Sequence, residues 1–157
     1  MNVRKAKLKD VSSIANMGLK LGRYHLKYDP KYMALVPNVL QLYKKHFARS
    51  IHSRNSLMLI AEVKGKIIAY CLAELGKRPP VYRVRRVGYI SDVYVEPSYR
   101  RKGISKKFLE ESHNWFKEKK LNYSELAVYE KNKGAVTAYK KAGYLPILIR
   151  KQKKLIR

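Results

Sequence analysis

The sequence predicts one α/β domain over residues 1–157, built on a mixed antiparallel and parallel central sheet with helices on both faces. Three observations support this fold class. The chain has 157 residues, of which 46% are hydrophobic and 30% are charged, and this composition suits one globular domain with its own core. Its second half alternates strand-like and helix-like segments, which is typical of parallel crossovers. Its first half holds two apolar runs around a tight turn, which favours antiparallel pairing.

The first half is expected to contain strands and two helices. In chain order the expected segments are a strand at Val3–Ala6, a helix capped by Asp10, a helix from about Pro37-Asn38, and strands at Leu57–Val63 and Lys66–Glu74. Both helices carry apolar residues at helical spacing. Tyr28-Asp29-Pro30 separates them, because the residue before a proline avoids helical geometry. The two strands flank Lys64-Gly65, a hairpin signal.

The second half is expected to alternate strands and helices. The expected segments are a strand at Val84–Glu96, a helix from about Gly103 to Lys119, a strand at Ser124–Tyr129, a helix over about Asn132–Ala142 and a strand at Tyr144–Ile149. Arg78-Pro79-Pro80 makes a stiff turn into the first of these strands, and Pro97 ends it. Gly143 stands where a helix closes on a left-handed residue. We expect the tail Lys151–Arg157 to be frayed.

The net charge is strongly positive. Lys and Arg number 36 and Asp and Glu number 11, which gives a formal charge of +25. Such a field attracts phosphate groups. The basic residues are spread along the chain with small clusters at Arg83–Arg86, Arg100–Lys102 and Arg150–Arg157, and no zinc-finger, basic-zipper or RNA-recognition motif accompanies them. This distribution favours a solvated surface, so we expect only weak, non-specific binding of polyanions.

Several classes of protein are excluded by what the chain lacks. A single cysteine, Cys71, excludes a disulfide framework, a cysteine-based zinc site and an iron–sulfur cluster. The four histidines show no compact ligand spacing with Asp or Glu, so no metal is expected. The longest apolar runs fall far short of the roughly 20 residues of a membrane span, and no apolar signal segment follows the N-terminus. We therefore expect a cytoplasmic protein away from membranes, either a monomer or a homodimer.

The segment Tyr89–Leu109 has the features of a phosphate cradle. A buried strand runs into a proline, then into a short basic turn, Arg100–Lys102, and through Gly103 into a helix. The first N–H groups of a helix lack intrahelical partners and lie at the positive end of its dipole. A glycine there lets a ligand approach the backbone closely. The turn is therefore suited to a phosphate or pyrophosphate, although it matches neither the P-loop nor the dinucleotide pattern.

A second segment, Leu126–Tyr144, lies about thirty residues downstream. On a helix of 3.6 residues per turn, Asn132, Ala135 and Tyr139 share one face. An amide, a small residue and a phenol in a row suit the lining of an extended ligand. Considered alone, a helical tyrosine such as Tyr139 is more often a packing residue at the edge of the core.

Together the two segments resemble the GNAT superfamily of acyl-CoA-dependent N-acetyltransferases. The family pattern of V-x-P followed by [QR]-x-x-G-x-[GA] is matched by Val95-Glu96-Pro97 and by Arg100 through Ser105. The later pattern N-x-x-A-x-x-x-Y-x-x-x-G-[FY] is complete from Asn132 to Tyr144. Ser105 departs from the family's glycine or alanine by one hydroxyl. The resemblance extends over essentially the whole chain and implies a GNAT-like fold.

The resemblance also implies a function and a set of site residues. Acetyl-CoA would be the acyl donor and a primary amine the acceptor, with direct attack on the thioester in a ternary complex. Tyr139 would protonate the departing thiolate, as a phenol with a pKa near 10 can at neutral pH. The residues implied in cofactor binding are Val93 and Val95 through their backbone, the turn residues Arg100, Arg101, Lys102, Gly103, Ile104 and Ser105, and Asn132.

The general base is less clearly indicated. Asp92 is the first candidate, because a carboxylate in an otherwise apolar strand is costly to bury and needs a reason to be there. Strict alternation places it opposite Ser91 and Val93, but a bulge would change its face. Its alternative role is to pair with a lysine or an arginine. Glu74 and His25 are further candidates near the acceptor.

The acceptor itself stays open between a small amine and a protein N-terminus or lysine. An alternative from another class is a non-catalytic module that uses the same fold to sense acyl-CoA or to associate with nucleic acid. An intact Asn132 and Tyr139 favour the enzyme.

Overall fold

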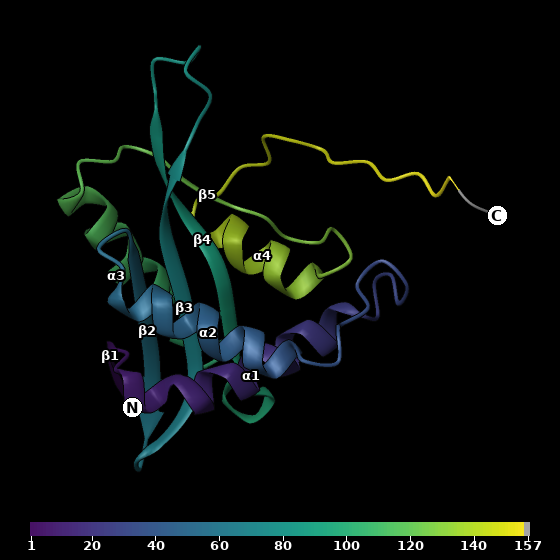
Figure 1. Ribbon diagram of the computed structural model, residues 1–157. Coiled ribbons are helices and arrows are strands. Elements are labelled where there is room, and N and C mark those ends of the chain that lie inside the picture. Colours follow the sequence, from purple (N-terminus) through teal and green to yellow (C-terminus); the bar gives the residue numbers. More distant parts are fainter. Residues whose placement is uncertain (156–157) are drawn as a thin grey trace.

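The computed structural model describes residues 1–155 as one open sheet with helices packed against it (Figure 1). The strands are β1 (Asn2–Lys5), β2 (Ser56–Val63), β3 (Lys66–Lys77), β4 (Arg86–Val95) and β5 (Ser124–Leu126). The helices are α1 (Val11–His25), α2 (Val39–His52), α3 (Ile104–Glu118) and α4 (Lys133–Lys141), with short 3-10 turns η1 (Leu8–Asp10) and η2 (Pro97–Tyr99). The strand order is β1-β2-β3-β4-β5.

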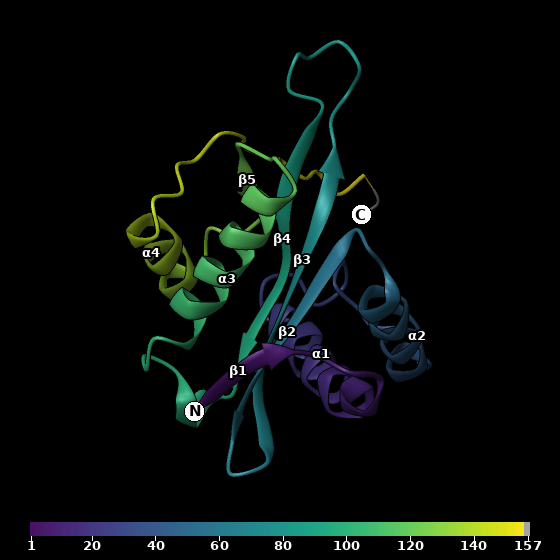
Figure 2. The same cartoon turned by 90° about the vertical axis from the view of Figure 1, so that its left-hand side faces the viewer.

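The sheet has the mixed pairing that the sequence predicts. The first four strands pair antiparallel, and β4 pairs with β5 in parallel. Figure 2 shows α1 and α2 on one face of the sheet and α3 and α4 on the other. The chain crosses from β4 to β5 through α3, the connection that parallel strands require. The predicted fold class is therefore confirmed.

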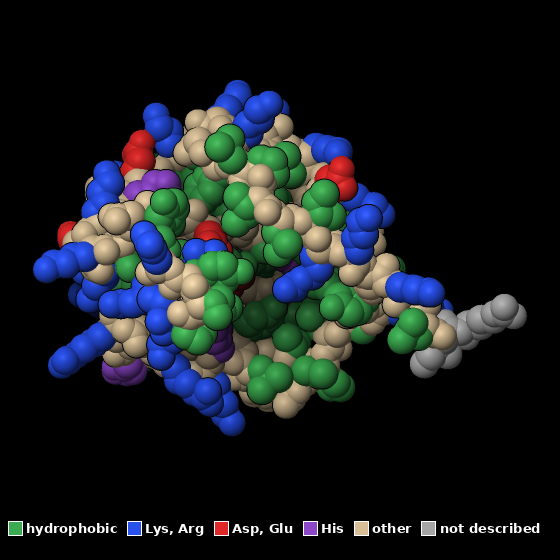
Figure 3. All heavy atoms as spheres, turned by 90° about the horizontal axis from the view of Figure 1, so that it is seen from above, with side chains coloured by type: hydrophobic (Ala, Val, Ile, Leu, Met, Phe, Trp, Pro, Cys, Tyr) green, Lys and Arg blue, Asp and Glu red, His purple; other side chains and the backbone are tan. Residues whose placement is uncertain are grey.

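Most Lys and Arg side chains lie on the outside of this framework, whereas the carboxylate of Asp10 is buried. Four ion pairs join described residues: Arg4 with Asp10 and Glu62, Lys20 with Glu96, and Lys106 with Glu110. Seen from the end at which the β3–β4 connection projects, Lys and Arg side chains lie around much of the rim (Figure 3). In the middle of this view, hydrophobic side chains line a hollow with an acidic side chain beside it.

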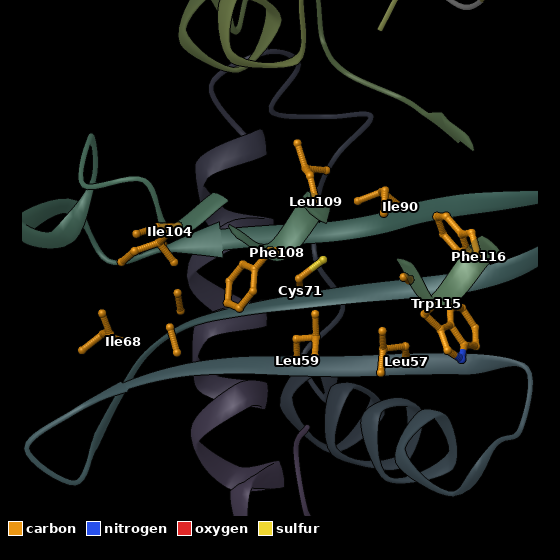
Figure 4. Packing of buried hydrophobic residues seen from close by; sticks show 14 of the residues in the cluster. Leu57, Leu59, Ile68, Cys71, Ile90, Ile104, Phe108, Leu109, Trp115 and Phe116 are labelled. Carbon is orange, nitrogen blue, oxygen red and sulfur yellow. The ribbon is translucent and has the colours of Figure 1, made fainter. Parts of the chain in front are cut away.

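Two apolar layers fill the space between helices and sheet. On the α3 side, Phe108, Leu109 and Phe116 pack on β2, β3 and β4, with Cys71 in the middle of the layer (Figure 4). On the other side, α1 and α2 pack through Ile14 and Phe47 on the opposite face of the same strands. Because strand residues alternate between faces, each of the long inner strands contributes to both layers.

Two local predictions about glycines are confirmed. Lys64 and Gly65 both have positive φ, +48° and +76°, as the two-residue turn of a hairpin requires. Gly143 follows α4 with φ of +87° and closes it in the left-handed region.

Asp10 stands at the N-cap position of α1, as predicted, but it does not cap the helix through its side chain. The carboxylate is buried and instead accepts hydrogen bonds from the Arg4 guanidinium at 2.7 and 3.1 Å and from the Lys7 N–H at 2.8 Å. The arginine lowers the pKa of Asp10 below its ordinary value. An ion pair with Arg4 of strand β1 therefore takes the place of a side-chain helix cap.

The predicted last strand at Tyr144–Ile149 is wrong. Residues 144–149 have no regular structure, and the side chains of Leu145, Ile147 and Ile149 are 77–81% exposed. β-favouring residues form a strand only where an edge is available to pair with them, and β5 offers three residues. The chain instead leads away from the sheet (Figure 1). The tail that follows is exposed and without regular structure to residue 155, and residues 156–157 lie outside the described part.

Gly88 gives a prediction about stability. It lies in β4 beneath α3, where an added Cβ would stand 2.3–2.5 Å from the Phe116 ring. Gly88→Ala should therefore lower the free energy of unfolding by about 1–3 kcal/mol or more through overpacking. Gly134→Ala is the matched control, because a Cβ at Gly134 meets nothing within 4 Å and alanine favours a helix. Urea unfolding checks both, and equal stability of the two variants would contradict the packing.

Candidate functional site

The edge of β4 that faces β5 is unpaired over half of its length. The two strands pair only from Gly88 to Ile90, opposite Ser124–Leu126. Beyond that point, Glu96 donates its N–H to Ile68 of β3, so by alternation Val93 and Val95 turn their N–H and C=O groups to the open side. An extended polar chain laid along this edge can form strand-like hydrogen bonds with Val93 and with the N–H of Val95, whose carbonyl accepts a hydrogen bond from Arg100 Nε.

At the end of this edge lies a turn whose backbone N–H groups have no backbone acceptor among the described residues. The first intrahelical bond of α3 runs from Lys107 N to Gly103 O. None of the N–H groups of residues 101–106 has a backbone acceptor among residues 1–155. Arg101 and Gly103 have positive φ, +61° and +78°, which folds the turn so tightly that the helix starts directly after it. N–H groups without a backbone acceptor in the described part of the chain, at a helix start beside Arg101 and Lys102, form an anion site in physical terms.

The Arg100 side chain points back to the strand. Its Nε donates to the Val95 carbonyl at 3.0 Å, and its guanidinium carbon lies 5.8 Å from the centre of the Tyr24 ring. Arg100 therefore joins the end of the open edge to helix α1. Ile104 is buried in the core, and Ser105 is half-buried on the first turn of α3.

A bulge in β4 places Asp92. The register skips from the pair Ala73–Ile90 to the pair Leu72–Asp92, so Ser91 is the extra residue. Without the bulge, Asp92 would share the face of Ile90 and enter the apolar layer under α3. With it, Asp92 lies on the face of Leu72, and Tyr70 Oη donates to Asp92 Oδ2 at 3.4 Å. The bulge that would change the face of Asp92 is therefore present.

The surroundings of Asp92 make it a better base than an exposed aspartate. Burial raises its pKa above the ordinary value of 3.8, and the nearby Glu74 carboxylate acts in the same direction. His46 and the Tyr70 hydroxyl lower it in part. Ser91 Oγ donates to Glu74 Oε2, so the second carboxylate lies beside the bulge. Among the described residues, no Lys or Arg forms an ion pair with Asp92.

Tyr139 lies on α4 and packs against the apolar layer that contains Cys71. Burial raises the pKa of its phenol above 10.0, and the Cys71 thiol, Tyr144 and Asp92 act in the same direction. The phenol is therefore protonated at neutral pH and lies within electrostatic range of Asp92. Burial also raises the pKa of Cys71 to about 12, so this thiol is not a nucleophile.

Tyr144 fixes the end of α4. Its hydroxyl is 2.8 Å from His113 Nε2 of α3 and 2.7 Å from Ser124 Oγ of β5. Its ring meets Tyr139 edge-on with the ring centres 6.0 Å apart. The sequence pattern contains Tyr144 but does not show that it holds the Tyr139 helix on both α3 and β5.

Asn132 and His25 have other local contacts. The Asn132 side chain caps α4 by accepting the N–H of Ala135 at 3.4 Å. His25 lies in an aromatic cluster at the end of α1 with Tyr24, Tyr28 and Tyr129. Tyr28 and Tyr129 are stacked with centres 4.7 Å apart, which joins α1 to the loop before α4. No sequence pattern indicated this cluster, since its members are up to 105 residues apart.

Neither a membrane span nor a metal site is found in the described residues. No helix within residues 1–155 is long and apolar enough to cross a bilayer. No group of three or more His, Cys, Asp or Glu side chains in that range could hold a metal ion.

Solved structures share this mixed sheet and the helices that cover it. A mutant of the BH1408 protein from Bacillus halodurans has a TM-score of 0.88 at 24% identity, with 99% of this chain and 100% of that chain covered. An aminoglycoside antibiotic 6'-N-acetyltransferase from Acinetobacter haemolyticus gives 0.75 at 16% identity, with 99% and 100% covered. Both show the fold alone.

The family follows from a match in sequence. The acetyltransferase (GNAT) family model matches residues 24–144, so the chain belongs to this family. A predicted acetyltransferase from Clostridium acetobutylicum, solved with acetyl-CoA, is 25% identical with a TM-score of 0.75, covering 98% of this chain and 96% of that chain. A search of curated proteins finds no match.

Proposed function

We propose that the protein transfers the acetyl group of acetyl-CoA to a primary amine by direct attack in a ternary complex. The observation that carries this proposal is the open edge of β4, with free N–H groups of the α3 turn at one end and Asp92 and Tyr139 at the other. An elongated ligand with an anionic end and a reactive end fits this order. The family membership and the acetyl-CoA complex of the Clostridium protein support it.

The binding roles follow from the polar groups along the edge. The N–H groups of residues 101–105 hold the pyrophosphate, and the Arg101 and Lys102 side chains add positive charge to them. Val93 and Val95 bond through their backbone to the amides of the pantetheine arm. Arg100 positions the end of the edge through the Val95 carbonyl. Asn132 caps α4 through its Oδ1, which leaves its side-chain NH2 group as a donor for the same arm.

The chemical roles fall to two side chains. Acetyl-CoA supplies an activated thioester whose carbonyl carbon an amine can attack. Asp92 accepts the proton that the amine loses as its C–N bond forms, directly or through a water next to Glu74. Tyr139 donates its proton to the sulfur as the C–S bond breaks, so the leaving thiolate is neutralised. Both proton transfers become favourable as charge develops in the transition state. Stabilisation that acts only there raises the rate.

The acceptor is a small amine or a protein N-terminus or lysine. The carboxylates Asp92 and Glu74 attract an ammonium group locally, whereas the net charge of +25 repels polycations at long range. The Acinetobacter protein acts on aminoglycosides, but at 16% identity it supports only the shared fold for this chain.

The experiment that tests the proposal is a coenzyme-release assay with acetyl-CoA against pooled primary amines. We expect thiol release that needs both the enzyme and an amine. Acetyl-CoA binding without release in any pool would favour a non-catalytic acyl-CoA module. The absence of acetyl-CoA binding would refute the site as a whole.

Gly103 provides a sharper test of the cofactor site. Gly103→Glu places a negative charge where the pyrophosphate meets the N–H groups, so acetyl-CoA affinity in calorimetry should fall below detection. Gly65→Glu is the matched control, because Gly65 has a similar φ, +76° against +78°, and a Cβ meets nothing within 4 Å at either position. The control shares the charge and the backbone strain and should bind normally. Equal affinities of the two variants would remove the turn from the site.

A further inference from the structure

The connection between β3 and β4 projects from the sheet as a basic arm, which we define as residues 77–86. Figures 1 and 2 both show it extending beyond the helices. It carries five cationic side chains in ten residues: Lys77, Arg78, Arg83, Arg85 and Arg86. The chain has no Asp or Glu from residue 75 to residue 91. The arm is therefore a local concentration of positive charge within a broadly basic surface.

The arm places like charges opposite each other. Lys77 is the direct cross-strand partner of Arg86, and the Arg78 N–H bonds to the Arg85 carbonyl at 2.9 Å in the next pair. Like charges directly opposite destabilise a strand pair. None of the four ion pairs among the described residues includes an arm residue. Folding alone gives no reason for this arrangement, whereas a bound polyanion would remove the repulsion.

The tip of the arm also carries an exposed aromatic platform. Tyr82 is 49% exposed, and the guanidinium carbon of Arg78 lies 4.5 Å from the centre of its ring. The tip is held in shape because Tyr82 N–H bonds to the Pro79 carbonyl at 3.2 Å and Arg85 Nη1 to the Pro80 carbonyl at 3.2 Å. An aromatic ring among arginines is the arrangement on which unpaired bases stack while phosphates are neutralised.

We propose that the basic arm binds single-stranded nucleic acid, with its arginines on the phosphates and a base stacked on Tyr82. The stacking platform favours this partner over polyglutamate or an anionic lipid surface, because neither a carboxylate side chain nor a phosphatidylserine headgroup has an aromatic ring to place there. The contacts are to backbone and ring faces, so binding is independent of base sequence. The inference does not depend on acetyl transfer.

The test uses the full chain and a fluorescent fifteen-residue oligouridine, with anisotropy measured over a range of salt concentrations. The arm variant combines Lys77→Gln, Arg83→Gln and Arg86→Gln. The matched control combines Lys44→Gln, Lys45→Gln and Arg49→Gln on the exposed side of α2, which removes the same charge elsewhere. We expect the arm variant to lose at least tenfold in affinity and its log–log salt slope to become shallower by about 2, since single strands contribute about 0.7 per phosphate. The control should change by less than about threefold.

Variants of Tyr82 separate the contribution of base stacking to binding from that of charge. Tyr82→Ala should weaken binding by about 5- to 150-fold without changing the salt slope, and Tyr82→Phe should restore it. Equal losses in the arm and α2 variants would show a diffuse charge effect and overturn the proposal. Tyr82→Ala binding as well as the wild type, or tighter binding to phosphatidylserine vesicles or polyglutamate than to the oligonucleotide, would overturn it too. Acetyl transfer is not part of any readout, so a failure here leaves the proposed enzyme unaffected.

Discussion

Replacing Tyr139 with phenylalanine is expected to lower the turnover number by about 10²–10⁴-fold, the usual contribution of a general acid. The ring stays packed on the Cys71 layer, and the change removes the one proton that the side chain can donate. The affinity for acetyl-CoA should hardly change, because the hydroxyl acts when negative charge develops on sulfur. The thermal midpoint should also stay close to that of the wild type. Steady-state kinetics together with a melting curve give all three values.

Tyr144→Phe is the matched control for this experiment, since it deletes the same atom from the neighbouring ring. Its hydroxyl contacts His113 and Ser124, so its loss leaves two half-buried polar groups without a partner. Stability should fall by about 1–3 kcal/mol while turnover stays within a few-fold. If Tyr139→Phe keeps full activity, the phenol is a packing residue and water protonates the thiolate.

Asp92→Asn is expected to lower kcat/KM by about 10²–10⁴-fold at neutral pH. The wild type should lose activity as the pH falls through the pKa of Asp92, which burial raises above that of an exposed aspartate. The variant should lack this acid limb and regain rate at alkaline pH, where the acceptor amine loses its proton to solvent. Glu74→Gln is the control carboxylate. A deeper loss in Glu74→Gln than in Asp92→Asn would assign the base to Glu74.

The same variant should be more stable than the wild type at neutral pH. A carboxyl whose pKa is raised on folding destabilises the folded state wherever it is ionised. The gain in melting temperature for Asp92→Asn should therefore be largest at neutral pH and disappear at about pH 3, below the ordinary pKa of aspartate. A stability loss at pH 7 would show that the Tyr70–Asp92 contact is a net stabilising interaction instead.

The structural features that were predicted best from the sequence are those with local causes. The Lys64-Gly65 turn, the Gly143 helix end and the strand–turn–helix around Gly103 depend on neighbours in the chain, and each was predicted from a few residues. The face of the sheet on which Asp92 lies could not be predicted from β4 alone, because a bulge is defined by the register of β4 against β3. Alternation alone could not decide it.

The errors and omissions have long-range causes. Asp10 resembles a helix cap locally, but Arg4 on strand β1 binds its carboxylate. Residues 144–149 have strand propensity without an edge to pair with. The aromatic cluster of Tyr24, His25, Tyr28 and Tyr129 forms only when α1 meets the loop before α4. Propensity and spacing contain no information about these contacts, which depend on how the elements pack.

The measurement that tests the central claim most directly is a crystal structure of the protein with acetyl-CoA. We expect the pyrophosphate on the N–H groups of residues 101–105, the pantetheine arm along Val93 and Val95, and the sulfur within hydrogen-bond distance of Tyr139 Oη. The Asp92 carboxylate should face the thioester carbon. A pyrophosphate bound away from the α3 turn, or a thioester out of reach of both Tyr139 and Asp92, would contradict the proposed function.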